Sequence, residues 1–167
     1  MRFTDGHAGS SICTPSRYSI LTGRYAWRSR LKRGIVWEWD GALIESGRPT
    51  VASMLRDQGY RTACLGKWHL GYADDYTPNA HGFDEFIGHH SWTIGYYNHQ
   101  TETGEPGLYQ NGEVVHREGY LTDLLTDEAI DFIGRSKDQP FFLTLAYNAA
   151  LPPYQPPGMP PSAWNDG

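Results

Sequence analysis

The sequence predicts one α/β domain with a mostly parallel sheet and flanking helices. Segments with helical periodicity alternate with short apolar segments, and the connections between them are short. The near-continuous apolar run 140–146 is typical of a parallel strand that is buried on both faces. A length of 167 residues, with 39% hydrophobic and 20% charged residues, suits a single globular domain. Because only two crossover units are evident, we expect the sheet to lack some of its partner strands.

The first helix is expected to run from Thr14 to Gly23. Thr14 is a fair N-cap, and the proline that follows it suits the first helical position, where a missing N–H costs nothing. Gly23 is a good residue to end the helix. Ile20 and Leu21 are expected to face inward, and Cys13 stands just before the helix N-terminus. The basic segment 24–33 is expected to be a loop, and the Trp-rich segment 36–44 a loop or an extended stretch.

The second helix is expected over residues 50–58. Thr50 is its N-cap, and Gly59 ends it. Val51, Met54 and Leu55 have the spacing of one apolar helix face.

A short strand, residues 60–65, follows at once, and the segment 66–71 leaves its carboxyl end. In open α/β sheets, ligands bind beyond the carboxyl ends of the strands. Lys67 and His69 therefore lie where chemistry is expected.

The second half of the chain contains one long helix. Residues 121–133 carry apolar side chains at helical spacing, and Gly134 is expected to end the helix. The segment 74–119 is loop-rich, with a short buried strand at 82–86. The proline-rich segment 152–167 has no periodicity and is expected to be an ordered loop or a ragged end.

Charge and hydropathy exclude several classes of partner. The net charge of −5 gives no support for nucleic acid or an anionic membrane, which favour basic patches. No apolar run approaches the ~18 residues of a membrane span. The first residues lack the features of a signal peptide, and the sequence alone assigns no cellular compartment. The chain has two cysteines, Cys13 and Cys64, which are too few for a disulfide framework or a cysteine-only zinc site. The sequence is compatible with one disulfide between them.

The stretch from Cys13 to Gly23 carries the strongest chemical signal. A reactive group at a helix N-terminus meets free backbone N–H groups and the positive end of the helix dipole, which favour an anion. Arg17 lies one turn further along and can offer a bidentate fork to the same anion. An isolated cysteine would be interpreted as a buried structural residue. The fixed spacing of proline, serine and arginine argues against that interpretation.

These residues resemble the sulfatase family. CTPSRYSILTG matches the family pattern Cys-x-Pro-Ser-Arg-x-x-x-Leu-Thr-Gly, and a second family motif follows in GYRT and GKWH, residues 59–62 and 66–69. GFDEF and FFLTLAYNA are also similar to sulfatase segments, so the resemblance covers most of the chain. It implies the alkaline-phosphatase-like α/β fold.

The resemblance also implies a mechanism. Cys13 would be oxidised to formylglycine by the formylglycine-generating enzyme, which reads Cys-x-Pro-x-Arg. One hydroxyl of the hydrated aldehyde would attack sulfur, and the other would then expel sulfate. Arg17 would hold the diol, Lys67 would contact the sulfate and the nucleophile, and His69 would assist deprotonation. The substrate would be an aryl or carbohydrate sulfate ester, and Ca²⁺ would be a cofactor with the formylglycine derived from Cys13 among its ligands.

Three departures from the family pattern stand out. Sulfatases carry a calcium-binding Asp-Asp pair near the N-terminus, whereas Asp5 is the only acidic residue before Cys13. The downstream Asp-Asn ligands and a later lysine have no match before Gly167. Leu151 occupies the position of a histidine that contacts the sulfate or the leaving group, and leucine cannot donate a proton. We therefore expect residues 1–167 to be an internal part of a sulfatase catalytic domain.

Other residues and other functions have weaker support. The acidic pair at residues 74–75 comes in the wrong order for the metal pair and is interpreted as a solvated loop. The remaining histidines lack zinc-type spacing and are expected on the surface, with the lining of a substrate pocket left open for some of them; they are His81, His89, His90, His99 and His116. The alternative interpretation is a catalytically inactive homologue that binds anions or a partner. A cysteine phosphatase is disfavoured, because its loop has the pattern Cys-x5-Arg and Arg17 comes only four residues after Cys13, two residues too early.

Overall fold

A computed structural model describes residues 2–158 of the chain. Its centre is a five-stranded sheet in the order β4-β3-β2-β1-β5. β1 (Arg61–Lys67) lies between β2 (Glu85–His89) and β5 (Phe141–Ala146), and both pairings are parallel. β3 (Tyr109–Gln110) and β4 (Glu113–Val114) extend the sheet in antiparallel pairs. The sheet is therefore mixed, with a parallel centre.

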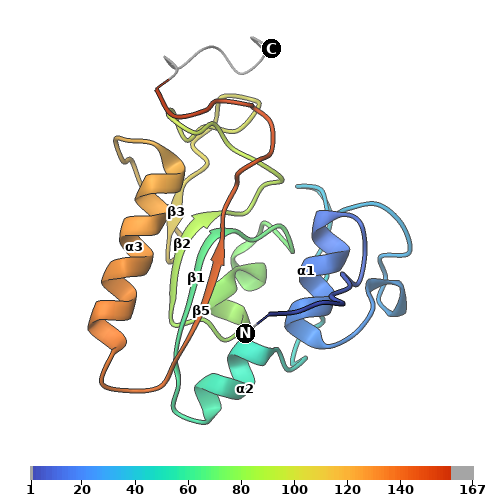
Figure 1. The fold of residues 1–167 in the computed structure, drawn as a ribbon. Helices are drawn as coiled ribbons and strands as arrows, with labels where there is room; N and C mark the ends of the chain where they lie inside the picture. Colours follow the sequence, from blue (N-terminus) through green and yellow to red (C-terminus); the bar gives the residue numbers. More distant parts are fainter. Residues whose placement is uncertain (1, 159–167) are drawn as a thin grey trace.

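Helices cover both faces of this sheet (Figure 1). α3 (Leu121–Ser136) packs on one face, while α1 (Cys13–Thr22) and α2 (Val51–Asp57) lie on the other. Short 3₁₀ turns occur in the connections, at Ala26–Arg28, Asp74–Tyr76 and Pro78–His81. The predicted layered α/β arrangement is thus present. No helix within residues 2–158 has both the length and the apolarity to cross a bilayer.

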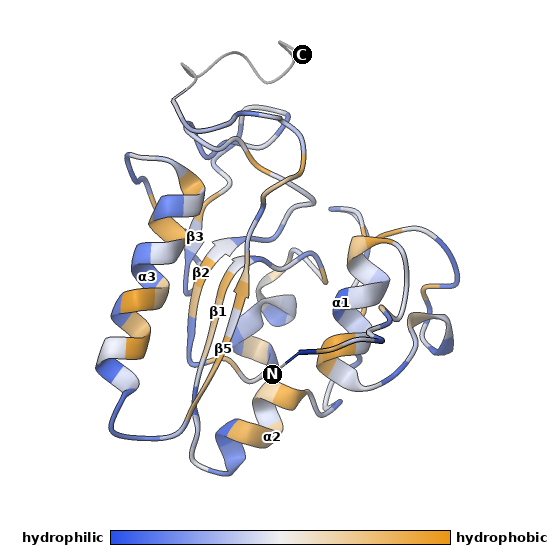
Figure 2. Ribbon diagram, in the orientation of Figure 1, coloured by the Kyte–Doolittle hydropathy of each residue, from blue (hydrophilic) through white to orange (hydrophobic). Residues whose placement is uncertain are grey.

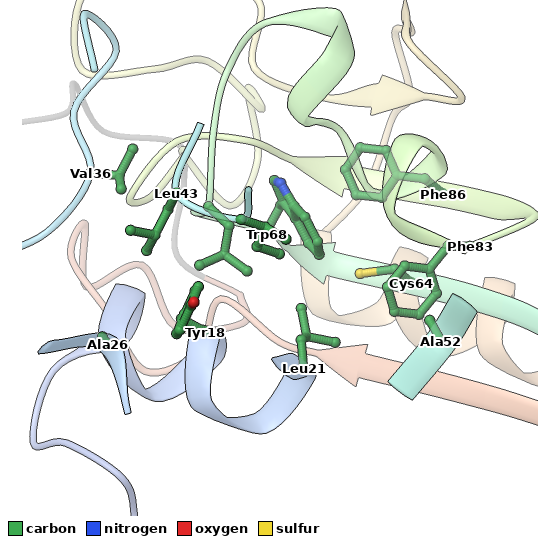
Figure 3. Packing of buried hydrophobic residues seen from close by; sticks show 12 residues of the cluster. Tyr18, Leu21, Ala26, Val36, Leu43, Ala52, Cys64, Trp68, Phe83 and Phe86 are labelled. Carbon is green, nitrogen blue, oxygen red and sulfur yellow. The ribbon is translucent and has the colours of Figure 1, made fainter. Parts of the chain in front are cut away.

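Each face of the sheet has its own hydrophobic core. The face toward α3 buries Leu65 and Ile87 against Leu121 and Leu125. On the opposite face Trp68 lies between the α1 side chains and the sheet (Figure 3). The hydropathy colouring shows the same division, with apolar central strands and polar outer helix surfaces (Figure 2).

Local capping signals account for the helix ends that were predicted correctly. Gly23 has the left-handed φ of 67° at which a side chain would be strained, and this conformation ends the helix. The Thr50 side chain accepts a hydrogen bond from the Ser53 N–H, and the Ser53 side chain caps the Thr50 N–H in return. These ends depend only on neighbouring residues.

Thr14 is not an N-cap, contrary to the prediction. α1 begins at Cys13, and the capping position is Ile12, which has no side-chain hydrogen bond to the helix. Thr14 is fully buried, and its hydroxyl is used in tertiary contacts instead. Tertiary hydrogen bonds therefore override the local capping preference here.

Several expected inward-facing residues are exposed. Ile20 is 73% exposed, Met54 55% and Ile133 43%, because α1, α2 and α3 each bury a narrower stripe than their apolar spacing suggests. α3 also continues past Gly134 to Ser136, and β2 begins at Glu85 rather than at residue 82. A glycine in an exposed helix weakens it but does not have to end it.

β5 is not buried on both faces, contrary to the prediction. All six of its residues are partly exposed, because β5 lies at one edge of the sheet formed by the described residues.

Candidate functional site

Cys13 is the first residue of α1, and its side chain is half-buried. No side chain at the capping position accepts from the first N–H groups of the helix. These groups and the helix dipole favour a negative charge beside Cys13. Cys13 therefore lies at a helix N-terminus, as predicted.

Arg17 and Lys67 meet Cys13 in one pocket. The pocket has a volume of about 420 Å³ between α1 and the sheet, and all three residues line it. Nη1 of Arg17 donates to the Lys67 backbone carbonyl at 2.5 Å, which fixes α1 to the end of β1. The Lys67 side chain is 2% exposed, and its ammonium lies within hydrogen-bonding reach of the Cys13 thiol. The pocket thus brings two cations to the helix N-terminus.

His69 lies beside this pocket without lining it, and three hydrogen bonds hold it there. Nε2 of His69 donates to the Val36 carbonyl at 3.1 Å. The Thr14 hydroxyl donates to the His69 carbonyl at 3.1 Å and accepts from the Val36 N–H at 3.3 Å. His69 itself has a positive φ of 59°, an uncommon backbone conformation for a residue other than glycine. Thr14 therefore ties α1 to both segments that position this imidazole.

Burial and nearby cations set the charges in the site. Burial lowers the pKa of Lys67, the Cys13 thiol opposes this shift, and the Arg17 charge adds to it. Burial, followed by the charges of Lys67 and Arg17, lowers the pKa of His69 to about 3. His69 is therefore neutral at physiological pH. Because its Nε2 carries the proton, Nδ1 is a bare acceptor, and this buried atom has no partner within the described residues.

The expectation that the remaining histidines lie on the surface is wrong for three of them. His89, His90 and His99 are each 5% exposed or less, whereas His116 is exposed. His89 ends β2, directly opposite Lys67 in the parallel register. Because that strand was expected at 82–86, His89 fell outside it and was not predicted to lie beside Lys67.

The described residues do not form a calcium site. Among the side chains that the structure describes, no group of three or more carboxylates, histidines or cysteines could hold a metal. Asp5 is exposed and pairs with His7 at 2.7 Å, and Asp75 is also exposed. Ca²⁺ requires about six to eight oxygen ligands. The described part of the chain therefore does not fit the expected cofactor.

Calcium titration tests this conclusion. We expect the isolated chain to bind Ca²⁺ weakly or not at all, because the matched ligand set is reduced to the Cys13 position. Isothermal titration calorimetry is the measurement. Tight stoichiometric binding would contradict the expectation, and loss of that binding in Asp75→Asn would identify the ligand.

The two thiols are expected to differ in reactivity. Burial raises the pKa of the Cys64 thiol to about 12, although the Arg17 charge opposes the shift. Alkylation needs a thiolate and access to it. Iodoacetamide should therefore label the half-buried Cys13 of the unmodified native chain, and Cys64 only after denaturation, as read by peptide mass spectrometry. Equal labelling of both thiols under native conditions would be inconsistent with the packing shown in Figure 3.

Comparison with known proteins supplies the family. The sulfatase family model matches residues 1–164. A sulfatase of Escherichia coli K12 named YdeN, described as uncharacterised, is 36% identical, over 89% of this chain and 30% of that protein. The arylsulfatase of Hemicentrotus pulcherrimus is 33% identical, over 88% of this chain and 30% of the enzyme. This chain thus spans about a third of the length of these relatives.

Solved structures agree with the sequence comparisons. The crystal structure of Ps i-CgsB superposes with a TM-score of 0.77 at 30% identity, over 89% of this chain and 36% of that one. The same protein in complex with k-i-k-neocarrahexaose gives a TM-score of 0.75. The expected alkaline-phosphatase-like α/β fold is therefore confirmed. Together with the family match over nearly its whole length, this shows that the chain belongs to the sulfatase family.

Proposed function

We propose that the protein carrying this chain hydrolyses sulfuric esters of aryl or carbohydrate alcohols. The observation that supports this function best is the pocket where Cys13, at the N-terminus of α1, meets Arg17 and Lys67. Cys13 would be converted to formylglycine by the formylglycine-generating enzyme, and the hydrated aldehyde then supplies the hydroxyl that attacks sulfur. Conversion requires the Cys-x-Pro-x-Arg pattern, which residues 13–17 provide.

The residues of the chain stabilise the charge that develops in this reaction. The Lys67 ammonium faces the pocket and would bind the non-bridging sulfate oxygens. The Arg17 guanidinium adds a second positive charge on the same side, close to the uncapped N–H groups of α1. Fixed donors in a site that excludes water stabilise a developing negative charge far more strongly than solvent does.

His69 is suited to accept a proton. Its ring is neutral, its Nε2–H is fixed on the Val36 carbonyl, and its Nδ1 is free to accept. We propose that Nδ1 takes the proton of a hydroxyl at the Cys13 position. A base held in one tautomer and orientation by a backbone carbonyl loses little entropy in that step.

The named relatives favour a sugar as the esterified alcohol. The N-acetylgalactosamine-6-sulfatase of Mus musculus is 30% identical over 92% of this chain and 33% of that enzyme. One structural neighbour was solved with a neocarrahexaose. These names support a carbohydrate sulfate as the first substrate class to test, with aryl sulfates as the alternative.

Mass spectrometry of the Cys13 peptide tests the proposal directly. The chain is co-expressed with a formylglycine-generating enzyme, and the Cys64 peptide serves as the unmodified control. Conversion replaces the Cys13 thiol with an aldehyde, so sulfur is lost from one peptide only. A Cys13 peptide that keeps its thiol would overturn the proposed nucleophile and would favour the inactive homologue.

The inactive homologue remains a second candidate because of Leu151, which supplies no proton to a leaving group. We expect the isolated chain, even after conversion, to show no turnover of a chromogenic aryl sulfate. Activity is therefore measured in a chimera, an active arylsulfatase relative whose matching segment is replaced by residues 2–158 of this chain. In the chimera, Leu151→His should raise turnover by ~10²–10⁴, the usual contribution of a general acid. Robust Cys13-dependent turnover by the isolated chain would contradict the expectation that the isolated chain is inactive.

A further inference from the structure

A basic loop follows α1, and the proposed reaction does not use it. Residues 24–33 contain five cations and no acidic residue, although the whole chain has a net charge of −5. The loop includes the 3₁₀ turn Ala26–Arg28, which packs against α1 on the side remote from the sheet (Figure 1). Two of the cations have partners elsewhere: Arg24 pairs with Glu45 at 3.4 Å, and Nε of Arg30 donates to a backbone carbonyl at 2.8 Å.

The other three cations are Arg28, Lys32 and Arg33, and all three are exposed. Among the side chains that the structure describes, no carboxylate forms an ion pair with any of them. The Lys32 ammonium donates to the Trp27 backbone carbonyl at 2.7 Å, which orients the ammonium without cancelling its charge. The loop therefore presents three uncompensated positive charges to a ligand.

Two exposed aromatic rings lie beside these charges. Trp27 is 57% exposed and Tyr25 54%, and their rings stack with centroids 5.8 Å apart and 14° between their planes. The Arg28 guanidinium lies over the Trp27 ring, 5.3 Å from its centroid. An exposed apolar patch that is bordered by charged groups is typical of a binding surface.

A small pocket joins this loop to the catalytic pocket. It has a volume of about 150 Å³, and Trp27, Lys32 and Arg33 line it. Ser10 and Ile12 line both this small pocket and the pocket that contains the candidate nucleophile. The two pockets therefore adjoin, at the segment that leads into α1.

The basic–aromatic patch consists of Trp27, Arg28, Lys32 and Arg33. We propose that this patch is an accessory subsite for a sulfated carbohydrate chain, and that it binds the sugars adjoining the ester in the catalytic pocket. Sulfate groups on these sugars pair with the cations, and the apolar face of one sugar ring packs on the Trp27 indole. The inference rests on the proposed sulfatase function and adds that the substrate is a polyanionic glycan.

Binding of a defined oligosaccharide tests the patch without any need for turnover. The probe is persulfated maltohexaose, unsulfated maltohexaose is the matched ligand, and calorimetry on the unconverted chain at two salt concentrations is the measurement. Arg28→Gln/Arg33→Gln should weaken binding of the sulfated probe about tenfold and make its salt dependence less steep. Arg56→Gln/Lys137→Gln removes the same charge from exposed positions elsewhere and should change the affinity less than twofold. Equal losses in the two double variants, or no binding of the sulfated probe by the parent chain, would overturn the proposal.

Trp27 distinguishes a glycan subsite from a general anion-binding surface. Trp27→Ala should weaken binding of persulfated maltohexaose about fivefold, and Trp27→Phe should restore most of the loss because it keeps an aromatic ring. Oligoglutamate of equal charge has no sugar rings, so its binding should not respond to Trp27→Ala. An oligonucleotide of equal charge that bound more tightly than the sulfated probe would assign the patch to nucleic acid and overturn the proposal.

Kinetics in the chimera separate this inference from the proposed function. Arg28→Gln/Arg33→Gln should raise KM for a sulfated oligosaccharide about tenfold and leave kcat/KM for a chromogenic aryl sulfate within about twofold, because the small ester does not reach the patch. Equal losses on both substrates would count against the subsite. An inactive chimera would contradict the proposed function, while the binding comparison would still decide the role of the patch. Thermal unfolding at the parent Tm confirms that each variant is folded, as expected for exposed positions.

Discussion

Lys67→Met is expected to lower kcat/KM of the converted chimera by ~10²–10³, the usual cost of removing one fixed electrostatic contact at a transition state. Methionine keeps most of the side-chain volume and removes the ammonium. Since Lys67 is 2% exposed, water cannot easily take over its role. Arg17 remains, but its Nη1 is already engaged by the Lys67 carbonyl. The loss should appear largely in kcat, because the charge on the sulfate oxygens increases in the transition state.

Lys137→Met is the control for this prediction. Lys137 is exposed at the C-terminal end of α3, on the opposite face of the sheet. Its replacement should leave kcat/KM within about twofold, the scatter expected of a surface substitution. Steady-state kinetics on a chromogenic aryl sulfate gives both values. If Lys67→Met behaved like the control, Lys67 would not contact the reacting sulfate, and the pocket would have to be assigned to another ligand.

Features that depend on neighbouring residues could be predicted from the sequence. Gly23 and Thr50 end and begin their helices as expected, because a left-handed C-terminal residue and a capping box need only adjacent atoms. The same is true of the position of Cys13 at the N-terminus of α1, because the residues that form the first turn follow it directly in the sequence. The strand that ends at Lys67 was also found, directly after Gly59, although it was expected to end at residue 65.

Features that depend on register and tertiary contacts could not be predicted. Thr14 looks like a cap in the sequence, yet its hydroxyl joins Val36 to His69, segments that are separated from it by 22 and 55 positions. His89 becomes a neighbour of Lys67 only when β2 pairs with β1 in one particular register. A shift of one residue would turn the His89 side chain to the other face of the sheet.

The structure also explains the error about β5. Its sequence of six apolar and β-forming residues is that of a central strand, but its position at the edge of the described sheet leaves every residue partly exposed. The amino-acid composition of a strand indicates that it can be buried on both faces. Whether it is buried depends on which neighbouring elements cover it.

Gly66→Ala is expected to be strongly destabilising. A Cβ at residue 66 would lie 2.1 Å from the Ala146 carbonyl oxygen of β5, and Gly66 has a φ of 104°, which side chains rarely adopt. Both obstacles are backbone in origin, so no rotamer change relieves them. Strain and overpacking of this kind together cost roughly 3–5 kcal/mol. Since Gly66 directly precedes Lys67, any relaxation of β1 would also displace the ammonium.

Gly134→Ala provides the matched comparison. Gly134 lies in α3 with no tertiary heavy atom within 4 Å of an added Cβ. Alanine should therefore stabilise the helix by about 0.5–1 kcal/mol. For a chain of this size, each kcal/mol shifts Tm by roughly 2–4 °C. Differential scanning calorimetry of the isolated chain should show Gly66→Ala melting roughly 10 °C or more below the parent and Gly134→Ala slightly above it. Unchanged melting of Gly66→Ala would mean that β1 and β5 do not approach as closely as the Gly66–Ala146 pairing requires, and the position of Lys67 at the pocket would have to be revised with it.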